Sequence, residues 1–235
     1  MTQPSAALDQ ILARTRYLLL DFDGPICDFY PDDSGRAVAD QLRAYLQDQG
    51  VTVPDDVATS NSPIEVLIHT ATIDPDLAEK AEAKLSTLEW TAAASAVPNA
   101  YAADLLVACR ESARMVAIVS NNSSRAIRFY LERHDLDRYV ALVIGRYSHD
   151  PDLLKPSPFL VERAISVLRA DPATCTMLGD SPTDIESAHQ AGITSIGYAN
   201  TPDKREQLTT AGADAIISSL ANLILRLRAH GISNL

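Results

Sequence analysis

The chain has 235 residues, 46% of them hydrophobic, which is enough for a substantial core in one domain or in a domain with a smaller insertion. Its formal net charge of -11 at pH 7 argues against nucleic acid or an anionic membrane as a general partner, and any anionic substrate would need a local cation or metal ion. No stretch approaches the roughly 20 apolar residues of a membrane span, and the N-terminus lacks a signal-peptide core, so we expect a soluble, cytoplasmic protein.

The first predicted element is a strand within the sequence YLLLDFDGPICD, residues 17–28. Its short apolar run, bounded by Gly24 and Pro25, is typical of a fully buried parallel strand, although periodicity alone does not distinguish it from a buried helix. Asp is a poor strand former, so we expect Asp21 and Asp23 where the strand ends. Ligands bind at the carboxyl ends of strands in open α/β sheets, which makes the two acids candidates for a functional role.

Residues 28–97 follow a different pattern. Helical periodicity covers residues 34–50 and 75–96, whereas residues 51–63 are loop-like and contain no convincing strand. We therefore expect a helical block inserted after the first strand. Within it Arg36, Lys80 and Lys84 are conceivable substrate contacts, although charged helix residues more often form a solvated face, and we expect Trp90 in the core of the block.

The rest of the chain alternates between apolar runs and helical patterns. The runs lie at residues 115–120, 139–145, 175–180, 193–198 and 214–218, and helical patterns at 121–134 and 156–169 stand between some of them. Such alternation predicts a doubly wound parallel sheet with helices on both faces. The predicted organisation is an α/β core made of residues 1–27 and 98–235, with residues 28–97 as a helical cap.

Polar residues follow the predicted strands in a regular way. The candidates, in chain order, are Asp21, Asp23, Ser120, Asn121, Lys155, Asp180 and Asp184. Each has an ordinary structural explanation: a turn, a helix cap or a solvated charge, and residues 181–184, SPTD, have the form of a helix N-terminus with a capping acid. Their joint occurrence at successive strand ends favours a common site at one edge of the sheet.

These residue types suit phosphoryl transfer. Three or four clustered carboxylates cannot all remain ionised without a cation, and oxygen ligands of this kind suit Mg²⁺. One carboxylate can attack phosphorus to form an aspartyl phosphate, while a second acid moves the proton of the leaving group and of water. Lys155 and Ser120 can hold the phosphoryl oxygens.

The same residues, in the same order, resemble the motifs of the haloacid dehalogenase superfamily, and in particular its phosphatase branch, which includes the phosphoglycolate phosphatases. The first motif, D-x-D-x-T/V, matches the sequence DFDGP at both acids; the second and third match Ser120 and Lys155; the fourth, an acid pair, matches GDSPTD. The resemblance covers the core along most of the chain. One departure is Pro25, where the family has Thr or Val, and its missing N–H could alter the loop that carries Asp23.

The resemblance implies a role for each candidate. Asp21 would be the nucleophile and Asp23 the general acid and base. Asp21, the main-chain carbonyl of Asp23 and Asp180 would bind Mg²⁺, with Asp184 supporting the metal site. Ser120, Asn121 and Lys155 would bind the phosphoryl group. The helical block stands at the position of the family's cap, which closes over the site and excludes water.

Four other functions remain open at this stage. A haloacid dehalogenase of the same superfamily would need neither Asp23 as an acid nor Asp180 as a metal ligand. A phosphosugar mutase shares all four motifs, so only its products distinguish it from a hydrolase. A phospho-acceptor signalling module places its paired acids before the acceptor and is roughly half this length. A catalytically inactive binding protein would have little reason to keep the full set of residues.

Several properties stay undetermined by the sequence. The substrate is expected to be a small phosphorylated metabolite, but no motif identifies it, and no feature specifies an oligomeric state. The three cysteines, Cys27, Cys109 and Cys175, form neither a disulfide framework nor a zinc motif, so each is expected to be a small buried residue.

Overall fold

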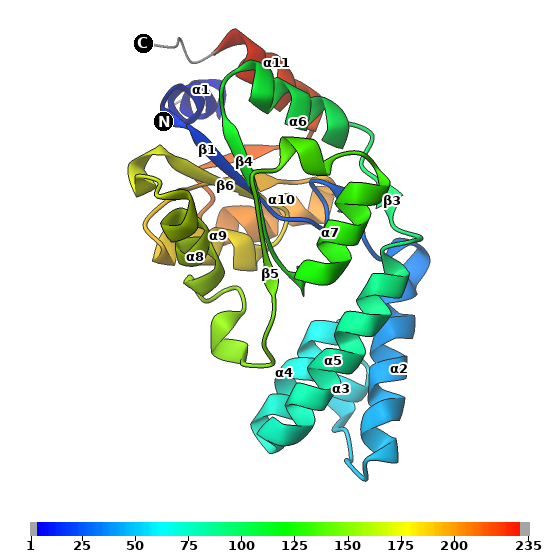
Figure 1. Cartoon of the computed structure of the whole chain (residues 1–235). Helices are drawn as coiled ribbons and strands as arrows, with labels where there is room; N and C mark the ends of the chain where they lie inside the picture. The colour runs from blue at the N-terminus through cyan, green and yellow to red at the C-terminus, as the bar shows by residue number, and fades with distance from the viewer. Residues whose placement is uncertain (1–3, 231–235) are drawn as a thin grey trace.

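The computed structural model describes residues 4–230, and its central feature is a six-stranded parallel β-sheet with the order β5-β4-β1-β6-β7-β8 (Figure 1). The strands are β1 (Tyr17–Leu20), β4 (Met115–Ser123), β5 (Leu142–Arg146), β6 (Cys175–Gly179), β7 (Thr194–Tyr198) and β8 (Ala215–Ile217). The chain adds β4 and β5 on one side of β1 and the last three strands on the other. The carboxyl end of β1 is therefore the switch point at which α/β proteins bind ligands.

Both faces of the sheet are covered by helices, because alternate residues of each strand point to opposite faces. Leu18 and Leu20 pack in one core cluster with α1 (Pro4–Arg14), α6 (Ala102–Glu111), α7 (Ser124–Arg133) and α11 (Leu220–Ala229). Leu19 packs in the other with α8 (Phe159–Leu168) and α9 (Pro182–Gln190), and α10 (Pro202–Thr210) follows β7. The predicted doubly wound α/β fold is confirmed.

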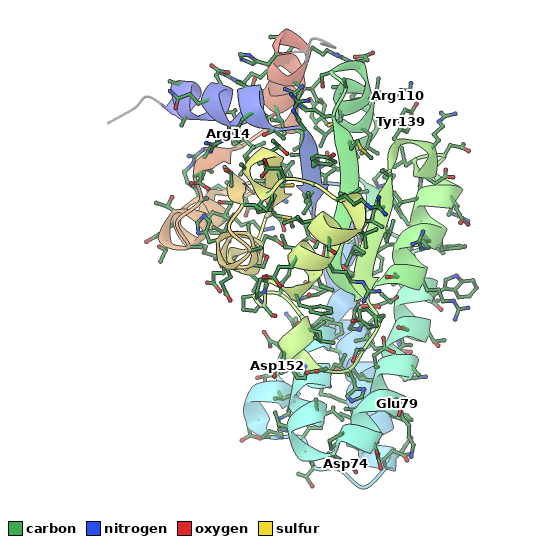
Figure 2. All side chains as sticks on the ribbon, turned by 60° about the vertical axis from the view of Figure 1, so that its left-hand side comes forward. Arg14, Asp74, Glu79, Arg110, Tyr139 and Asp152 are labelled. Atoms are coloured by element: carbon green, nitrogen blue, oxygen red, sulfur yellow. The ribbon has the colours of Figure 1, made fainter. Side chains whose placement is uncertain are left out.

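Residues 28–97 hold four helices: α2 (Ser34–Asp48), α3 (Asp55–Ala58), α4 (Pro63–Ile73) and α5 (Pro75–Ala92). They share a separate hydrophobic cluster to which Leu42, Leu67 and Leu85 belong, and Figure 1 places them as a group below the sheet. The chain leaves and re-enters the core through a short antiparallel pair, β2 (Cys27–Asp28) with β3 (Val97–Pro98). Asp74, which caps α5 by accepting hydrogen bonds from two main-chain N–H groups, marks the far end of this block (Figure 2).

Short 3₁₀ helices complete the fold: η1 (Pro31–Asp33), η2 (Asp137–Tyr139), η3 (Pro151–Leu153) and η4 (Pro172–Thr174). At the opposite end of the molecule from the helical block, the guanidinium of Arg110 lies 4.5 Å from the ring centroid of Tyr139, which ties α6 to η2 (Figure 2). No helix within residues 4–230 is long and apolar enough to cross a membrane.

Some local expectations were wrong. The segment 51–63 was expected to be a loop but includes α3, and the strand expected at residues 139–145 begins only at Leu142, because Tyr139 belongs to η2. Trp90 does not lie in the core of the helical block: its side chain is on the surface, and its ring centroid lies 5.3 Å from that of Phe129 on α7. The three cysteines are free and buried, as expected.

Candidate active site

Three carboxylates meet at the carboxyl ends of β1 and β6. One oxygen each from Asp21, Asp180 and Asp184 lies within 4.8 Å of the others, and all three residues are buried. Glycines make room for them: a Cβ on Gly24 would lie 2.2 Å from Asp180 Oδ2, and a Cβ on Gly179 would lie 2.3 Å from the Asp184 carboxyl group. Glycine at position 24 therefore permits the close approach of the two strand-end loops, and glycine at position 179 leaves room for Asp184 within the connection from β6 to α9.

Lys155 is the cation inside this cluster. Its Nζ lies 2.9 Å from Asp21 Oδ1, forms an ion pair with Asp184 and donates to the carbonyl of Val119 at 3.2 Å. Burial by itself would lower the pKa of Lys155, but the charges of Asp184 and Asp21 raise it above its ordinary value. The ammonium group therefore stays charged and neutralises part of the acid cluster.

The pKa values of the acids reflect their burial and the negative charge that Lys155 does not neutralise. Burial, followed by the charge of Asp184, raises the pKa of Asp21 to about 7 against the opposing effect of Lys155. Burial also raises the pKa of Asp180 to about 6, although an ion pair with Lys204 acts in the opposite direction. The buried carboxylates outnumber the cations that pair with them. Such a set of oxygen ligands is expected at a site for a hard divalent ion such as Mg²⁺.

Asp184 serves the cluster and its own helix together. One carboxylate oxygen pairs with Lys155, and the other accepts hydrogen bonds from the main chain and hydroxyl of Ser181, at 3.1 and 2.8 Å. The capping arrangement expected for SPTD is present at the start of α9. Asp184 therefore links Lys155 to the start of α9 at the edge of the acid cluster.

Asp23 lies beside this cluster, on the loop after β1. Its Oδ1 accepts a hydrogen bond from the N–H of Phe29 at 2.9 Å, and burial, supported by the charge of Asp21, raises its pKa to about 6. The turn that carries it is closed by the N–H groups of Gly24, Ile26 and Cys27. Pro25 therefore fits this turn without an N–H of its own.

Ser120 and Asn121 lie next to Lys155, within the irregularity that interrupts the pairing of β4 with β5 between Val119 and Ser123. The hydroxyl of Ser120 donates to Asn122 Oδ1 at 3.1 Å. The amide of Asn121 instead brackets the main chain of Lys155: its Nδ2 donates to the Lys155 carbonyl at 3.0 Å, and its Oδ1 accepts from the Lys155 N–H at 2.8 Å. Any effect of the Asn121 side chain on a phosphoryl group passes through Lys155 in this arrangement.

Sequence reasoning missed three polar residues around the site. Lys204 on α10 pairs with Asp180, Asn200 Nδ2 lies 3.5 Å from Asp180 Oδ2, and Asn99 donates to the carbonyl of Gly24 at 2.9 Å. Asn200 and Lys204 follow the carboxyl end of β7, so the strand-end rule that selected Asp180 would also have selected them.

A cavity of about 310 Å³ joins the acid cluster to the helical block. Its core side comprises Asp21, Asp23, Ser120, Asn121, Asn122, Lys155, Asp180, Ser181 and Thr183, and its other side comprises Tyr30, Asn61, Ser62, Pro63 and Ile64. The conceivable substrate contacts Arg36, Lys80, Lys84 and Trp90 do not line it in the described part of the chain. A larger cavity of about 630 Å³ beside α1 and α11 includes none of the predicted site residues.

A buried ion pair connects the helical block to the core side of this cavity. Arg146, at the end of β5, donates to both oxygens of Glu89 on α5, at 2.9 and 2.8 Å. Arg146 also donates to the carbonyl of Asn121 at 2.8 Å, and Glu89 accepts from the N–H of Ser123 at 2.9 Å. The pair therefore holds α5 against the end of β4.

The sequence pattern of the haloacid dehalogenase-like hydrolases matches residues 15–192. The chain belongs to this family. The match spans the strand-end acids, the lysine and the inserted helices, so the family prediction made from the four motifs is confirmed.

Two of the curated relatives that match this haloacid dehalogenase-like hydrolase are a phosphatase and a pyrophosphatase by name. A phosphoglycolate phosphatase of Vibrio vulnificus strain YJ016 is 26% identical over 219 residues, which cover 89% of this chain and 94% of the relative. The pyrophosphatase PpaX of Anoxybacillus flavithermus is 28% identical over 121 residues, or 52% of this chain and 55% of the relative.

Solved structures share the fold. A predicted phosphatase from Clostridium acetobutylicum superposes with a TM-score of 0.71 at 19% identity, covering 91% of this chain and 98% of the other. CbbY from Rhodobacter sphaeroides, solved in complex with phosphate, gives a TM-score of 0.68 at 18% identity, with coverage of 89% and 96%. At these identities the likeness extends to the fold alone.

Proposed function

We propose that the chain is a Mg²⁺-dependent phosphatase that hydrolyses a small phosphomonoester through an aspartyl phosphate on Asp21. The observation that carries this proposal is the buried cluster of Asp21, Asp180 and Asp184 around Lys155, facing a cavity of about 310 Å³. The name of the phosphoglycolate phosphatases among the curated relatives supports the same reaction.

Asp21, the main-chain carbonyl of Asp23 and Asp180 would hold the Mg²⁺ ion, which when bound would neutralise charge on the phosphoryl oxygens. The carboxylate of Asp21 attacks phosphorus, and the bond from phosphorus to the ester oxygen breaks. Asp23 gives its proton to the departing alkoxide and then takes a proton from the water that attacks the aspartyl phosphate. Breaking the bond between phosphorus and Asp21 releases inorganic phosphate and restores the carboxylate.

The proton-transfer role suits the environment of Asp23. A carboxyl group with an ordinary pKa is almost fully ionised at neutral pH and is a poor proton donor. Burial raises the pKa of Asp23 to about 6, which brings it closer to neutral pH, where it can both donate and accept a proton. Lys155 and Ser120 would hold the phosphoryl oxygens, with Asn121 fixing the main chain of Lys155.

We also propose that residues 28–97 act as a cap on a core formed by residues 1–27 and 98–235. The separate hydrophobic cluster of the helical block and the β2–β3 pair at its base support this division. Residues 61–64 of the block line the cavity, so movement of the block would open or close access to Asp21.

The test is hydrolysis of p-nitrophenyl phosphate with and without Mg²⁺, together with a search for phosphorylated Asp21 by mass spectrometry after rapid quenching. We expect Mg²⁺-dependent turnover that EDTA abolishes. Undiminished turnover in excess EDTA, or an adduct on another residue, would contradict the proposal. Analysis of the products separates hydrolysis from the transfer that a mutase would perform.

A further inference from the structure

The two sides of the active-site cavity differ in charge. The side formed by the helical block, which we call the cap wall, comprises Tyr30 and residues 61–64 and contains only neutral side chains. The opposite side carries the acids Asp21, Asp23 and Asp180. A substrate that places its phosphoryl group at Asp21 must therefore extend its leaving group along an uncharged wall.

The cap wall is held in place by contacts within the helical block. The buried Arg43 donates to the carbonyls of Val57 and Ser60, at 3.0 and 2.8 Å, which fixes the segment leading to Asn61. Ser62 then caps α4 by accepting from the N–H of Glu65. These contacts fix the conformation of the segment, so the cap wall is a defined surface with neutral side chains.

The cations nearest to the cavity are already paired. Lys155, the cation among the described residues that line it, binds Asp21 and Asp184. Lys204 pairs with Asp180, and Arg146 pairs with Glu89. A carboxylate on the leaving group, directed along the cap wall, would thus lose its water without gaining a cation.

The cap wall does offer neutral hydrogen-bonding groups. Tyr30 lines the cavity, but its hydroxyl oxygen is fully buried, without a hydrogen-bond partner among the described residues, and is not accessible from the cavity. Burial raises the pKa of Tyr30 well above its ordinary value, so the hydroxyl remains neutral. The amide of Asn61 lies on the same wall. Hydroxyl groups on a leaving alcohol would find a neutral partner in this amide, which can donate and accept hydrogen bonds.

We infer that, given the proposed phosphatase reaction, this site selects phosphomonoesters of uncharged, hydroxylated alcohols and discriminates against phosphorylated carboxylic acids. Tyr30 and residues 61–64 are the residues that determine this selection. The substrate class therefore differs from the one that the names of several relatives indicate, since phosphoglycolate carries a carboxylate on its leaving group.

A matched pair of substrates tests the inference. 2-Hydroxyethyl phosphate and 2-phosphoglycolate differ in that a CH₂OH group replaces the carboxylate. We expect kcat/KM of the native chain to be about 10- to 100-fold higher for 2-hydroxyethyl phosphate, the effect of burying an unpaired charged group. A preference for 2-phosphoglycolate, or equal values, would overturn the inference.

Adding a cation to the cap wall should raise the ratio of kcat/KM for 2-phosphoglycolate to kcat/KM for 2-hydroxyethyl phosphate. Asn61→Lys and Ile64→Lys are expected to improve kcat/KM for 2-phosphoglycolate relative to 2-hydroxyethyl phosphate by about tenfold, and the neutral variants Asn61→Gln and Ile64→Met, which add no charge, are expected to produce no such improvement. The ratio is independent of the fraction of folded protein. An unchanged ratio in both lysine variants would count against the cap wall as the selecting surface.

p-Nitrophenyl phosphate distinguishes a failure of the inferred substrate selection from a failure of the proposed phosphatase reaction. If the chain hydrolyses this ester and also prefers 2-phosphoglycolate to 2-hydroxyethyl phosphate, the inferred selection is overturned and the proposed phosphatase reaction stands. Failure to hydrolyse any of the three esters with Mg²⁺ would overturn the proposed function and the selection that rests on it.

Discussion

The two walls of the active-site cavity are built in different ways. On the core side, Asp21 and Asp180 stand at the ends of parallel strands, where the sheet fixes their spacing, and Lys155 joins them from the segment between η3 and α8. On the cap side, neutral residues come from the loop before α4 and from its first turn. The comparison suggests a division of labour: the sheet supplies the groups for phosphoryl transfer, and the helical block decides which leaving group can approach them.

The largest effect is expected at the nucleophile on the core wall. Asp21→Asn should lower kcat by more than about 10⁴-fold for every phosphomonoester, because an amide is a very poor nucleophile towards phosphorus. Steady-state assays with p-nitrophenyl phosphate and an alkyl phosphate measure the loss. If the variant kept measurable turnover with covalent phosphorylation, the core wall would not contain the nucleophile that we assign.

The second acid of the core wall should show a smaller loss that depends on the leaving group. Asp23→Asn removes proton delivery, which is typically worth about 10²–10⁴-fold. The loss should be smaller for p-nitrophenyl phosphate than for an alkyl phosphate, whose alkoxide needs the proton. Single-turnover phosphorylation measures both rates, and equal losses with the two leaving groups would contradict the acid role of Asp23.

The ion pair between the helical block and the α/β core is expected to control stability. Glu89→Gln leaves the buried guanidinium of Arg146 without its bidentate partner, a change that costs about 3–5 kcal/mol when a buried pair is broken. Glu82→Gln is the matched control on the same helix, because Glu82 contacts Arg146 through a single bond of 3.2 Å and is partly exposed. Urea unfolding measures both variants.

The activity of the same two variants is a second test of the ion pair between Glu89 and Arg146. Arg146 also binds the carbonyl of Asn121, whose amide holds the main chain of Lys155. Glu89→Gln should therefore lower kcat for p-nitrophenyl phosphate several-fold at temperatures well below its unfolding midpoint, whereas Glu82→Gln should not. Equal free energies of unfolding and equal kcat values in the two variants would show that the Glu89 contact has no special role.

The sequence predicted the core wall better than the cap wall, for a physical reason. Apolar runs locate the strands, and polar residues at their ends must lie at one edge of a parallel sheet, so the sequence groups Asp21 with Asp180. Lys155 lies between η3 and α8 and not at a strand end, so its motif and not the strand-end rule accounts for its prediction. The ion pair of Glu89 with Arg146 joins residues far apart in the chain, so no local sequence pattern predicts it. Residues 61–64 fall at the end of a segment that lacks periodicity, so only the packing of the helical block reveals that they line the cavity.

The smallest expected effect is the pH dependence of stabilisation by Mg²⁺, which tests the charge of the core wall directly. Burial raises the pKa of Asp21 from an ordinary value of 3.8 to about 7, so between those pH values the metal-free folded protein holds a proton that the unfolded chain has released. Stability from this group therefore falls as the pH rises through 7. Asp180, with a pKa raised to about 6, acts in the same direction at slightly lower pH.

Mg²⁺ must displace these protons, so its stabilisation of the folded protein should grow as the pH rises from 5.5 to 8. A ligand at a hundred times its dissociation constant stabilises by about 2.7 kcal/mol, which corresponds to a rise of several degrees in Tm for a chain of this size. Thermal unfolding with Mg²⁺ and with EDTA at the two pH values measures the shift. Asp180→Asn should remove most of it, because the amide is a weaker ligand for a hard cation. A shift that was equal at both pH values, or that survived in Asp180→Asn, would mean that the ion binds away from the acid cluster.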